Sequence, residues 1–223
     1  MSKCYDQNMR KEMFAGGEFY HIYNRGVDKR AIFLDKFDYE RFLQGMREFN
    51  SVDPIGSIYE NSFLKDKPKR KEKPLVSFVA YCINPNHFHF ILEQVSPKGI
   101  EKFMQRLGMG YAKYFNNKNK RSGTLFQGKF KAKHIDSNEY LLHLSVYVNL
   151  NFKVHKLGHS VSKSSWGKYK NGKFENNVSI NDRAVLDQFD NFDDYKKFAE
   201  SSLTDILERK EMYKKLEEVL IDD

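Results

Sequence analysis

Two histidines stand one residue apart in the stretch "NPNHFHFILEQ", residues 84–94. The stretch is rich in strand-favouring residues and begins with the turn signal Asn-Pro-Asn. Because side chains alternate between the two faces of a strand, His87 and His89 share one face with Ile91 and Glu93. Two imidazoles on one face can bind the same divalent cation and leave coordination positions open, as a catalytic metal site requires.

Two histidines alone are a weak signal, so a metal site needs further ligands. Glu93 is one candidate, and a helix packed over the histidine face could supply others. In residues 137–151 a narrow helical stripe includes Tyr147 and Asn151, one turn apart, which offers a phenol and a carboxamide together. The ordinary alternative for a single tyrosine is that its ring packs on the sheet and its hydroxyl is hydrogen-bonded.

The elements that must position these groups follow from hydrophobic periodicity and turn signals. Asp35 is the expected N-cap of one helix, and Asp136 and Glu139 have capping-box spacing at the start of another. The predicted order is strand, helix, strand, strand, helix, strand, helix, at residues 18–26, 35–50, 75–84, 87–94, 98–117, 124–135 and 137–151. This order is typical of an α+β domain, a ferredoxin-like antiparallel sheet with helices packed on it.

Charge is distributed unevenly along the 223 residues, whose net charge is +8. Residues 1–180 hold 31 Lys/Arg and 17 Asp/Glu, a net charge of +14, whereas residues 181–223 hold 7 and 13, a net charge of −6. The basic part is where a polyanion would bind, although a basic surface can also serve only to keep a protein soluble. We expect a catalytic domain over 1–153 with a basic insertion at 51–73, a basic connecting loop at 154–180, and an acidic helical C-terminal extension at 181–223.

The sequence also predicts a soluble, cytoplasmic protein. Its two cysteines, Cys4 and Cys82, form no CxxC pair, which argues against a disulfide framework or a cysteine zinc site. The longest apolar run, residues 75–83, is far shorter than the roughly 20 residues that span a bilayer. The N-terminal residues lack the apolar core of a signal peptide.

Four stretches together resemble the REP-associated tyrosine transposases, within the single-tyrosine transposases of the HUH endonuclease superfamily. They are "FYHIYNRG", "NPNHFHFIL", "GTLFQGKFKA" and "EYLLHLSVYVNLN", with a weaker match at "SSWGKY", and the resemblance covers about residues 15–170. It implies that His87 and His89 bind a divalent metal, Mg²⁺ or Mn²⁺, that Tyr147 is the nucleophile, and that Asn151 is the third ligand. The family usually has proline after that asparagine, where this chain has Phe152, which puts the end of the helix in doubt.

The reaction that this resemblance implies is metal-dependent cleavage of single-stranded DNA beside a hairpin, followed by strand transfer. Tyr147 would attack the scissile phosphate and hold the 5′ end as a phosphotyrosine, while the metal stabilises the developing charge. Basic and aromatic side chains are expected to contact phosphates and stack on bases: Arg25, Lys129, Lys131, Lys133, Tyr23, Phe126 and Phe130.

Two other functions are compatible with parts of the pattern. One is a non-catalytic regulatory module that binds DNA or RNA hairpins, which would have no need of His87, His89, Tyr147 and Asn151 together. The other is a structural zinc protein, which would need a fourth protein ligand that the sequence does not offer. Both a monomer and a homodimer are compatible with the sequence.

Overall fold

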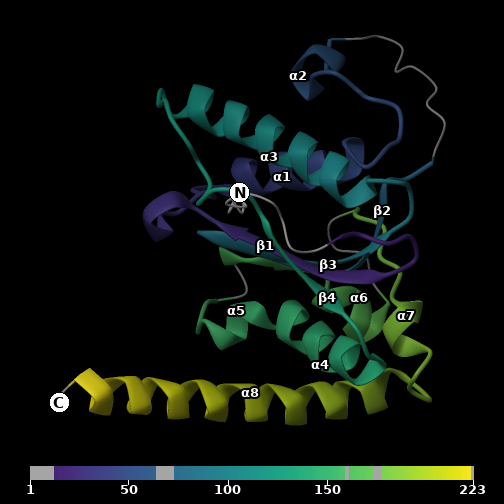
Figure 1. Ribbon diagram of the computed structural model, residues 1–223, viewed down its shortest axis with the longest axis vertical. Helices are drawn as coiled ribbons and strands as arrows, with labels where there is room; N and C mark the ends of the chain where they lie inside the picture. The colour runs from purple at the N-terminus through teal and green to yellow at the C-terminus, as the bar shows by residue number, and fades with distance from the viewer. Residues whose placement is uncertain (1–12, 64–72, 159–160, 173–176, 222–223) are drawn as a thin grey trace, which may run out of the picture.

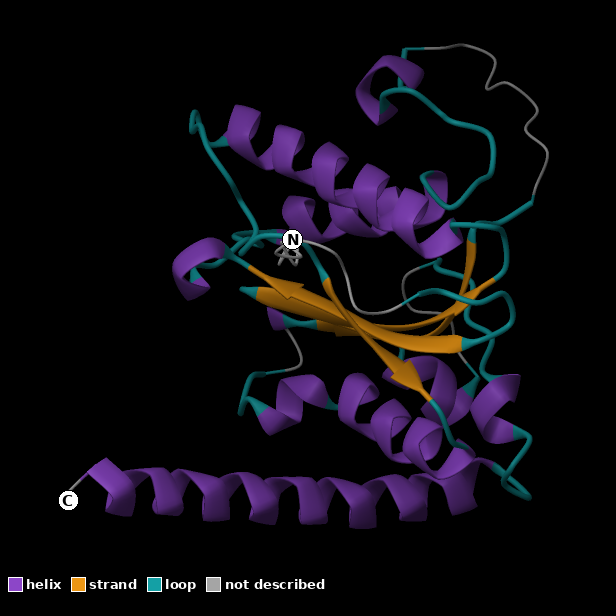
Figure 2. Ribbon diagram, in the orientation of Figure 1, coloured by secondary structure: helices purple, strands orange, loops and turns teal. Residues whose placement is uncertain are grey.

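A five-stranded antiparallel sheet lies between two layers of helices in the computed structural model (Figures 1 and 2). The structure describes residues 13–63, 73–158, 161–172 and 177–221, with side chains up to residue 213. The strands occur in the spatial order β4-β1-β3-β2-β5. They are β1 (Phe19–Arg25), β2 (Val76–Asn84), β3 (His87–Gln94), β4 (Lys131–Ile135) and β5 (Lys163–Ser164).

The helices cover both faces of this sheet. One layer contains α1 (Lys36–Glu48) and α3 (Gly99–Lys118), and the other contains α4 (Asn138–Asn149), α5 (Asn151–Val154), α6 (Trp166–Asn171) and α8 (Phe192–Ile221), as Figure 1 shows. The shorter elements are η1 (Val27–Lys29), α2 (Ile58–Asn61) and α7 (Arg183–Leu186). The expected α+β fold of ferredoxin-like type is therefore confirmed, and its strands and main helices follow the predicted order.

Strand alternation separates the apolar and the polar side chains of β3. Phe88 and Phe90 face the α1 layer, where both rings contact Phe42, with centroid separations of 5.3 and 6.2 Å. His89 faces the opposite layer, where its ring contacts Tyr147 of α4. The apolar face anchors the strand in the core, so the histidines are held on a rigid element.

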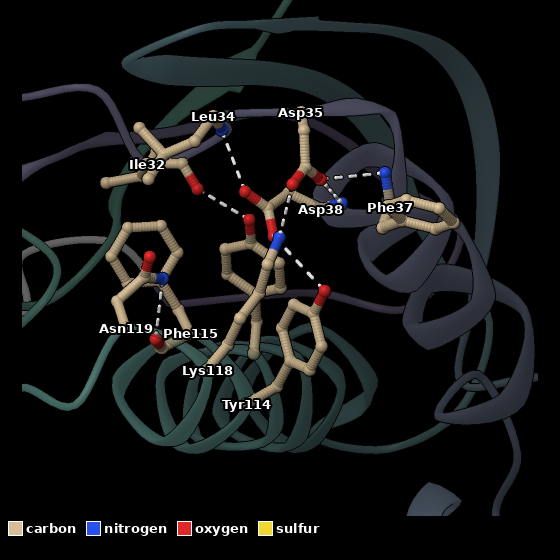
Figure 3. Close-up of polar contacts among 10 residues, drawn as sticks. Ile32, Leu34, Asp35, Phe37, Asp38, Tyr114, Phe115, Lys118 and Asn119 are labelled. Atoms are coloured by element: carbon tan, nitrogen blue, oxygen red, sulfur yellow. Dashed lines mark hydrogen bonds and ion pairs between the residues drawn. The ribbon is translucent and has the colours of Figure 1, made fainter.

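A buried carboxylate ties α1 to α3 (Figure 3). Asp38 is fully buried, and it accepts hydrogen bonds from the Leu34 backbone N–H, the Tyr114 hydroxyl and the Lys118 ammonium. Lys118 also pairs with Asp35, the N-cap of α1, at 2.7 Å. Partial burial acts to lower the pKa of Lys118, but its hydrogen bonds to the two carboxylates outweigh this effect and raise it. The charge that α1 buries is thus matched, as buried charges require.

The start and the end of the predicted 137–151 helix differ from expectation. Its N-cap is Ser137, whose hydroxyl accepts from the Tyr140 backbone N–H at 3.3 Å, so Asp136 lies one residue too early to cap it. The helix is interrupted at Leu150 (φ −108°, ψ 16°), where α4 ends and α5 begins. The backbone breaks here without a proline, and the Phe152 side chain that follows the break is buried in the core.

The expected connecting loop, residues 154–180, contains regular structure. β5 pairs antiparallel with β2 through Cys82 and Ile83, and α6 follows it. Its Gly, Ser and Lys composition suggested a loop, but the pairing with β2 is a long-range contact that local composition does not encode. Residues 159–160 and 173–176 of this segment, and residues 64–72 of the expected basic insertion, lie outside the described part of the chain.

The acidic extension packs against the outer side of α4. Tyr195 of α8 is buried, and its hydroxyl lies 3.0 Å from the Ser145 hydroxyl and accepts from Asn149 Nδ2 at 3.5 Å. Further along, Ser202 hydrogen-bonds His143 at 2.9 Å. Within the described residues, no helix is long and apolar enough to cross a membrane.

Candidate metal and nucleophile site

A pocket of about 420 Å³ opens where the ends of β1 and β3 meet α4 and α5. The two histidines of the HxH pair and Tyr147 line it together. Basic and polar side chains complete the wall, among them Arg25, Lys29, Gln127, Lys131 and His155. The fold therefore brings His87, His89 and Tyr147 to one concave surface with cationic groups around it.

The turn before β3 orients His87. Asn86 donates from its amide to the Lys29 carbonyl oxygen at 3.0 Å, which fixes its amide oxygen toward His87 Nδ1, 2.6 Å away. Because a carboxamide oxygen only accepts, His87 Nδ1 must be the donor. The lone pair of the neutral ring is therefore on Nε2, where a metal ligand needs it.

Asn151 of α5 lies next to this nitrogen. Its Oδ1 lies 3.0 Å from His87 Nε2 and accepts from Asn84 Nδ2 at 2.7 Å. Asn84 Nδ2 is also 2.9 Å from His87 Nε2, so one amide group brings both atoms together. Asn151 is fully buried, and its Nδ2 has no hydrogen-bond partner among the described residues.

These donors fit a small divalent cation. Two neighbouring ligands of an octahedral Mg²⁺, each about 2.1 Å from the ion, are about 3.0 Å apart, which matches the Nε2 to Oδ1 separation. Within the described ranges, no group of three His, Cys, Asp or Glu side chains could hold a metal, so a site here would need the Asn151 amide. Glu93, the other candidate ligand, lies at the opposite end of β3, where its register partner is Phe19.

His89 lies between His21 and Tyr147. His21 Nε2 is 2.9 Å from His89 Nδ1, and the rings stack with their centroids 5.1 Å apart. The Tyr147 ring meets the edge of His89 at 5.5 Å. Burial lowers the pKa of His21 to about 4 and holds that of His89 well below its usual range, and the neighbouring imidazoles act in the same direction on His89. Both rings are therefore neutral at pH 7.

The Tyr147 phenol is also neutral at pH 7. Burial raises its pKa above the ordinary value of 10, while the Asn151 amide opposes part of this rise without a hydrogen bond of standard geometry. Burial likewise lowers the pKa of His87, while the contact with Asn151 acts to raise it. A phenol in this environment is a poor nucleophile until its proton is removed or its target is made more electrophilic.

The sequence "NRG" has a structural role beside the pocket. A Cβ on Gly26 would lie 2.3 Å from the Arg30 carbonyl oxygen, so only glycine allows this close approach. The turn places the Lys29 carbonyl oxygen within reach of Asn86, which in turn orients His87. Gly26 therefore acts on the site through the backbone.

The predicted DNA-contacting residues occupy three places. Arg25, Tyr23 and Lys131 line the pocket with the histidines, and the Arg25 guanidinium hydrogen-bonds Gln127. Phe126, Phe130 and Lys129 instead line a second, mainly apolar cavity of about 430 Å³ next to α3. Lys133 lies outside both, with its ammonium 4.7 Å from the centre of the Tyr140 ring.

Sequence reasoning missed four residues at the site: His21, Asn84, Asn86 and His155. The structure pairs His21 with His89. The centre of the His155 ring lies 4.7 Å from that of the His87 ring. The position of His155 depends on the break at Leu150, which has no proline signal, and the contact of His21 depends on strand register.

Residues 61–151 match the family model described as IS200-like transposase. Among solved structures, a REP-associated tyrosine transposase bound to a REP hairpin aligns with 79% of this chain and 93% of its own, with a TM-score of 0.50 and 14% identity. The resemblance to these transposases is confirmed. No curated protein matches the chain.

The part of the chain that matches the IS200-like transposases contains all four residues of the predicted site. It extends from α2 through β2, β3, α3, β4 and α4 to the first residue of α5, and so includes His87, His89, Tyr147 and Asn151. The structural likeness to the REP-associated tyrosine transposase extends further and shows a shared fold.

Proposed function

We propose that this chain is a transposase that cuts and rejoins single-stranded DNA beside hairpins, with a divalent metal and a 5′-phosphotyrosine intermediate. The observation that carries the proposal is that His87, His89 and Tyr147 line one pocket, with the buried Asn151 oxygen 3.0 Å from His87 Nε2. The match to IS200-like transposases and the solved neighbour's complex with a REP hairpin support it. A protein that only binds hairpins would have no need of this set.

In this proposal Tyr147 is the nucleophile and the other three residues hold the cation. The Tyr147 oxygen forms a bond to phosphorus and loses its proton, the bond from phosphorus to the 3′ oxygen breaks, and that oxygen takes up a proton. A bound Mg²⁺ or Mn²⁺ would supply electrophilic stabilisation of the scissile phosphate. His87, His89 and Asn151 offer neutral ligands, so they leave the charge of the cation for the phosphate.

The surroundings of the pocket indicate how a strand would be held. Arg25 and Lys131 line its wall and would neutralise phosphates next to the scissile one. Asn24 of β1 lines both this pocket and the apolar cavity beside it. An unpaired base could thus stack on Phe126 and Phe130 while its neighbouring phosphate lies near Tyr147.

All four proposed functional residues come from one copy of the chain. β3 provides the histidines, α4 the tyrosine and α5 the asparagine. The four residues of the proposed site are therefore brought together without a second subunit. We propose that the first cleavage occurs within a single chain, whether the protein is a monomer or a homodimer.

The experiment that tests this function is a covalent adduct assay. The protein is mixed with labelled single-stranded hairpin DNA from beside its gene, with Mn²⁺ or with EDTA, and run on a denaturing gel. We expect a protease-sensitive shifted band with Mn²⁺, and a loss of at least about 1000-fold in Tyr147→Phe, which lacks the attacking oxygen. Tyr140→Phe is the matched control, because Tyr140 lies on the same helix but outside the pocket.

Binding of the same DNA separates the two functional classes. A transposase should retain the affinity for the hairpin in Tyr147→Phe while losing the adduct. Tight binding without any adduct, unchanged by EDTA, would instead support a hairpin-binding regulatory module. An adduct that persists in Tyr147→Phe would show that another residue is the nucleophile.

A further inference from the structure

A buried imidazole pair connects β1 to β3 beside the proposed metal ligands. His21 has Ile91 as its register partner on β3, and His89 has Tyr23 on β1, so the two histidines are diagonal neighbours on one face of the sheet. His21 Nε2 and His89 Nδ1 are 2.9 Å apart, and each residue is only 8% exposed. At this distance and burial one of the two nitrogens carries the shared proton.

The contact decides which nitrogen of His89 can bind a metal. Nδ1 faces His21, so the nitrogen that is left for a cation is Nε2. A neutral imidazole has one donor and one acceptor nitrogen, and a metal-binding nitrogen must carry the lone pair. His89 Nδ1 must then carry the hydrogen and donate it to His21 Nε2.

We propose that His21 is a positioning residue, which accepts a hydrogen bond from His89 Nδ1 and so holds the Nε2 lone pair of His89 ready for a divalent cation. This inference rests on the proposed function of the same site. His21 acts through His89 and needs no contact with DNA or with the cation. Groups that hold the outer nitrogen of a metal-binding histidine fix the ring orientation and the tautomer.

His87 provides an independent parallel on the same strand. Its Nδ1 donates to Asn86 Oδ1, whose orientation the Lys29 carbonyl oxygen fixes. Each histidine of the HxH pair thus has a separate acceptor at Nδ1, an amide in the turn for His87 and an imidazole on the next strand for His89. The same arrangement at both residues leaves both Nε2 atoms for one cation.

Mn²⁺ binding in the absence of DNA tests the proposal without depending on catalysis. Titration of the full chain with Mn²⁺, followed by electron paramagnetic resonance of the free ion, gives a dissociation constant for each variant. We expect His21→Phe, which keeps a ring but removes the acceptor, to weaken binding by about 10–100-fold. His21→Gln retains an acceptor oxygen and should recover most of this loss.

His134→Phe is the matched control for this titration. His134 lies on β4, is partly exposed and pairs with Glu18, so its replacement should leave the Mn²⁺ dissociation constant unchanged. Circular dichroism shows whether each variant is folded. Equal Mn²⁺ affinity of wild type and folded His21→Phe would overturn the proposal, and so would a wild-type protein that binds no Mn²⁺.

A second measurement reads the tautomer directly in the metal-free protein. Long-range ¹⁵N–¹H spectra should show His89 protonated at Nδ1 in the wild type and a mixture of tautomers in His21→Phe. Protonation of His89 at Nε2 in the wild type would contradict the proposal, even where a variant does not fold. If Mn²⁺ binds and the tautomer is as expected but no adduct forms, the proposed transposase activity fails while the role of His21 stands.

Discussion

Asn151 combines contacts that fold stability alone does not explain. Its oxygen accepts from Asn84 and lies 3.0 Å from His87 Nε2, whereas its buried Nδ2 has no partner among the described residues. An unsatisfied buried donor costs roughly 1–3 kcal/mol, so an apolar residue of similar size would suit the core better. The proposed role as a metal ligand accounts for a carboxamide at this position.

Substitution of Asn151 tests this role. Asn151→Leu removes the ligand oxygen and should weaken Mn²⁺ binding by at least about tenfold and abolish the DNA adduct. Asn151→Asp keeps the shape and adds a charged oxygen, so it should bind Mn²⁺ at least as tightly as the wild type. Isothermal titration with Mn²⁺ measures both, with Asn119→Leu at the exposed end of α3 as a control. Wild-type affinity in Asn151→Leu would place the third ligand elsewhere.

The tyrosine helix is positioned by what packs on its far side. Tyr195 of α8 contacts Ser145 and Asn149, the residues two before and two after Tyr147 in α4. Helical residues two positions apart point in nearly opposite directions. Ser145 and Asn149 therefore contact Tyr195 on the side of α4 that faces away from the pocket. α8 also reaches the end of α5, where Lys210 donates to the Val154 carbonyl oxygen at 2.6 Å. The acidic extension therefore supports the elements that carry Tyr147 and Asn151.

Removal of the Tyr195 hydroxyl group tests whether α8 supports α4. Tyr195→Phe keeps the ring in the core but leaves two buried polar groups of α4 without this partner, so we expect the free energy of unfolding to fall by about 1–2 kcal/mol. Urea unfolding followed by circular dichroism measures the change. Tyr213→Phe is the control on the same helix, since Tyr213 is 63% exposed and should change stability little. Equal effects of the two substitutions would argue against a supporting role for Tyr195.

Across the whole molecule, the two faces of the sheet differ in the side chains that they carry. The face toward α1 and α3 is apolar, and the matched Asp38–Lys118 pair joins these two helices, whereas the other face carries His21 and His89 under α4. Burial of neutral histidines has a thermodynamic consequence. The pKa of His21 falls from 6.5 to about 4 on folding, so between these values the unfolded chain binds a proton that the folded chain does not.

Stability should therefore depend on pH in a defined window. The contribution of His21 is fully present above pH 6.5 and decreases as the pH falls toward 4, by roughly 1.4 kcal/mol per pH unit and about 3 kcal/mol in all. His89 acts in the same direction, since burial lowers its pKa as well. Urea unfolding in EDTA at pH 7, 5.5 and 4.5 measures the slope, and His21→Phe should reduce it. An unchanged slope in that variant would contradict the assignment.

Local patterns in the sequence determined the elements and the faces of the site. The period of two in residues 87–94 places His87 and His89 on one side, and the helical period places Tyr147 and Asn151 one turn apart. The resemblance to tyrosine transposases implies their roles, and Phe152 in place of the usual proline indicates an unusual end of the helix. These features depend on neighbours within a few positions along the chain, so they can be read without a structure.

Which groups meet at the site depends on tertiary contacts. The contact of His21 with His89 follows from the register of β1 on β3, and the orientation of His87 follows from a turn that Gly26 permits. The break at Leu150 and the pairing of β5 with β2 were likewise absent from local composition. The reason is physical: strand register and helix packing are set by burial across the whole core, and residues far apart in the chain contribute equally to it.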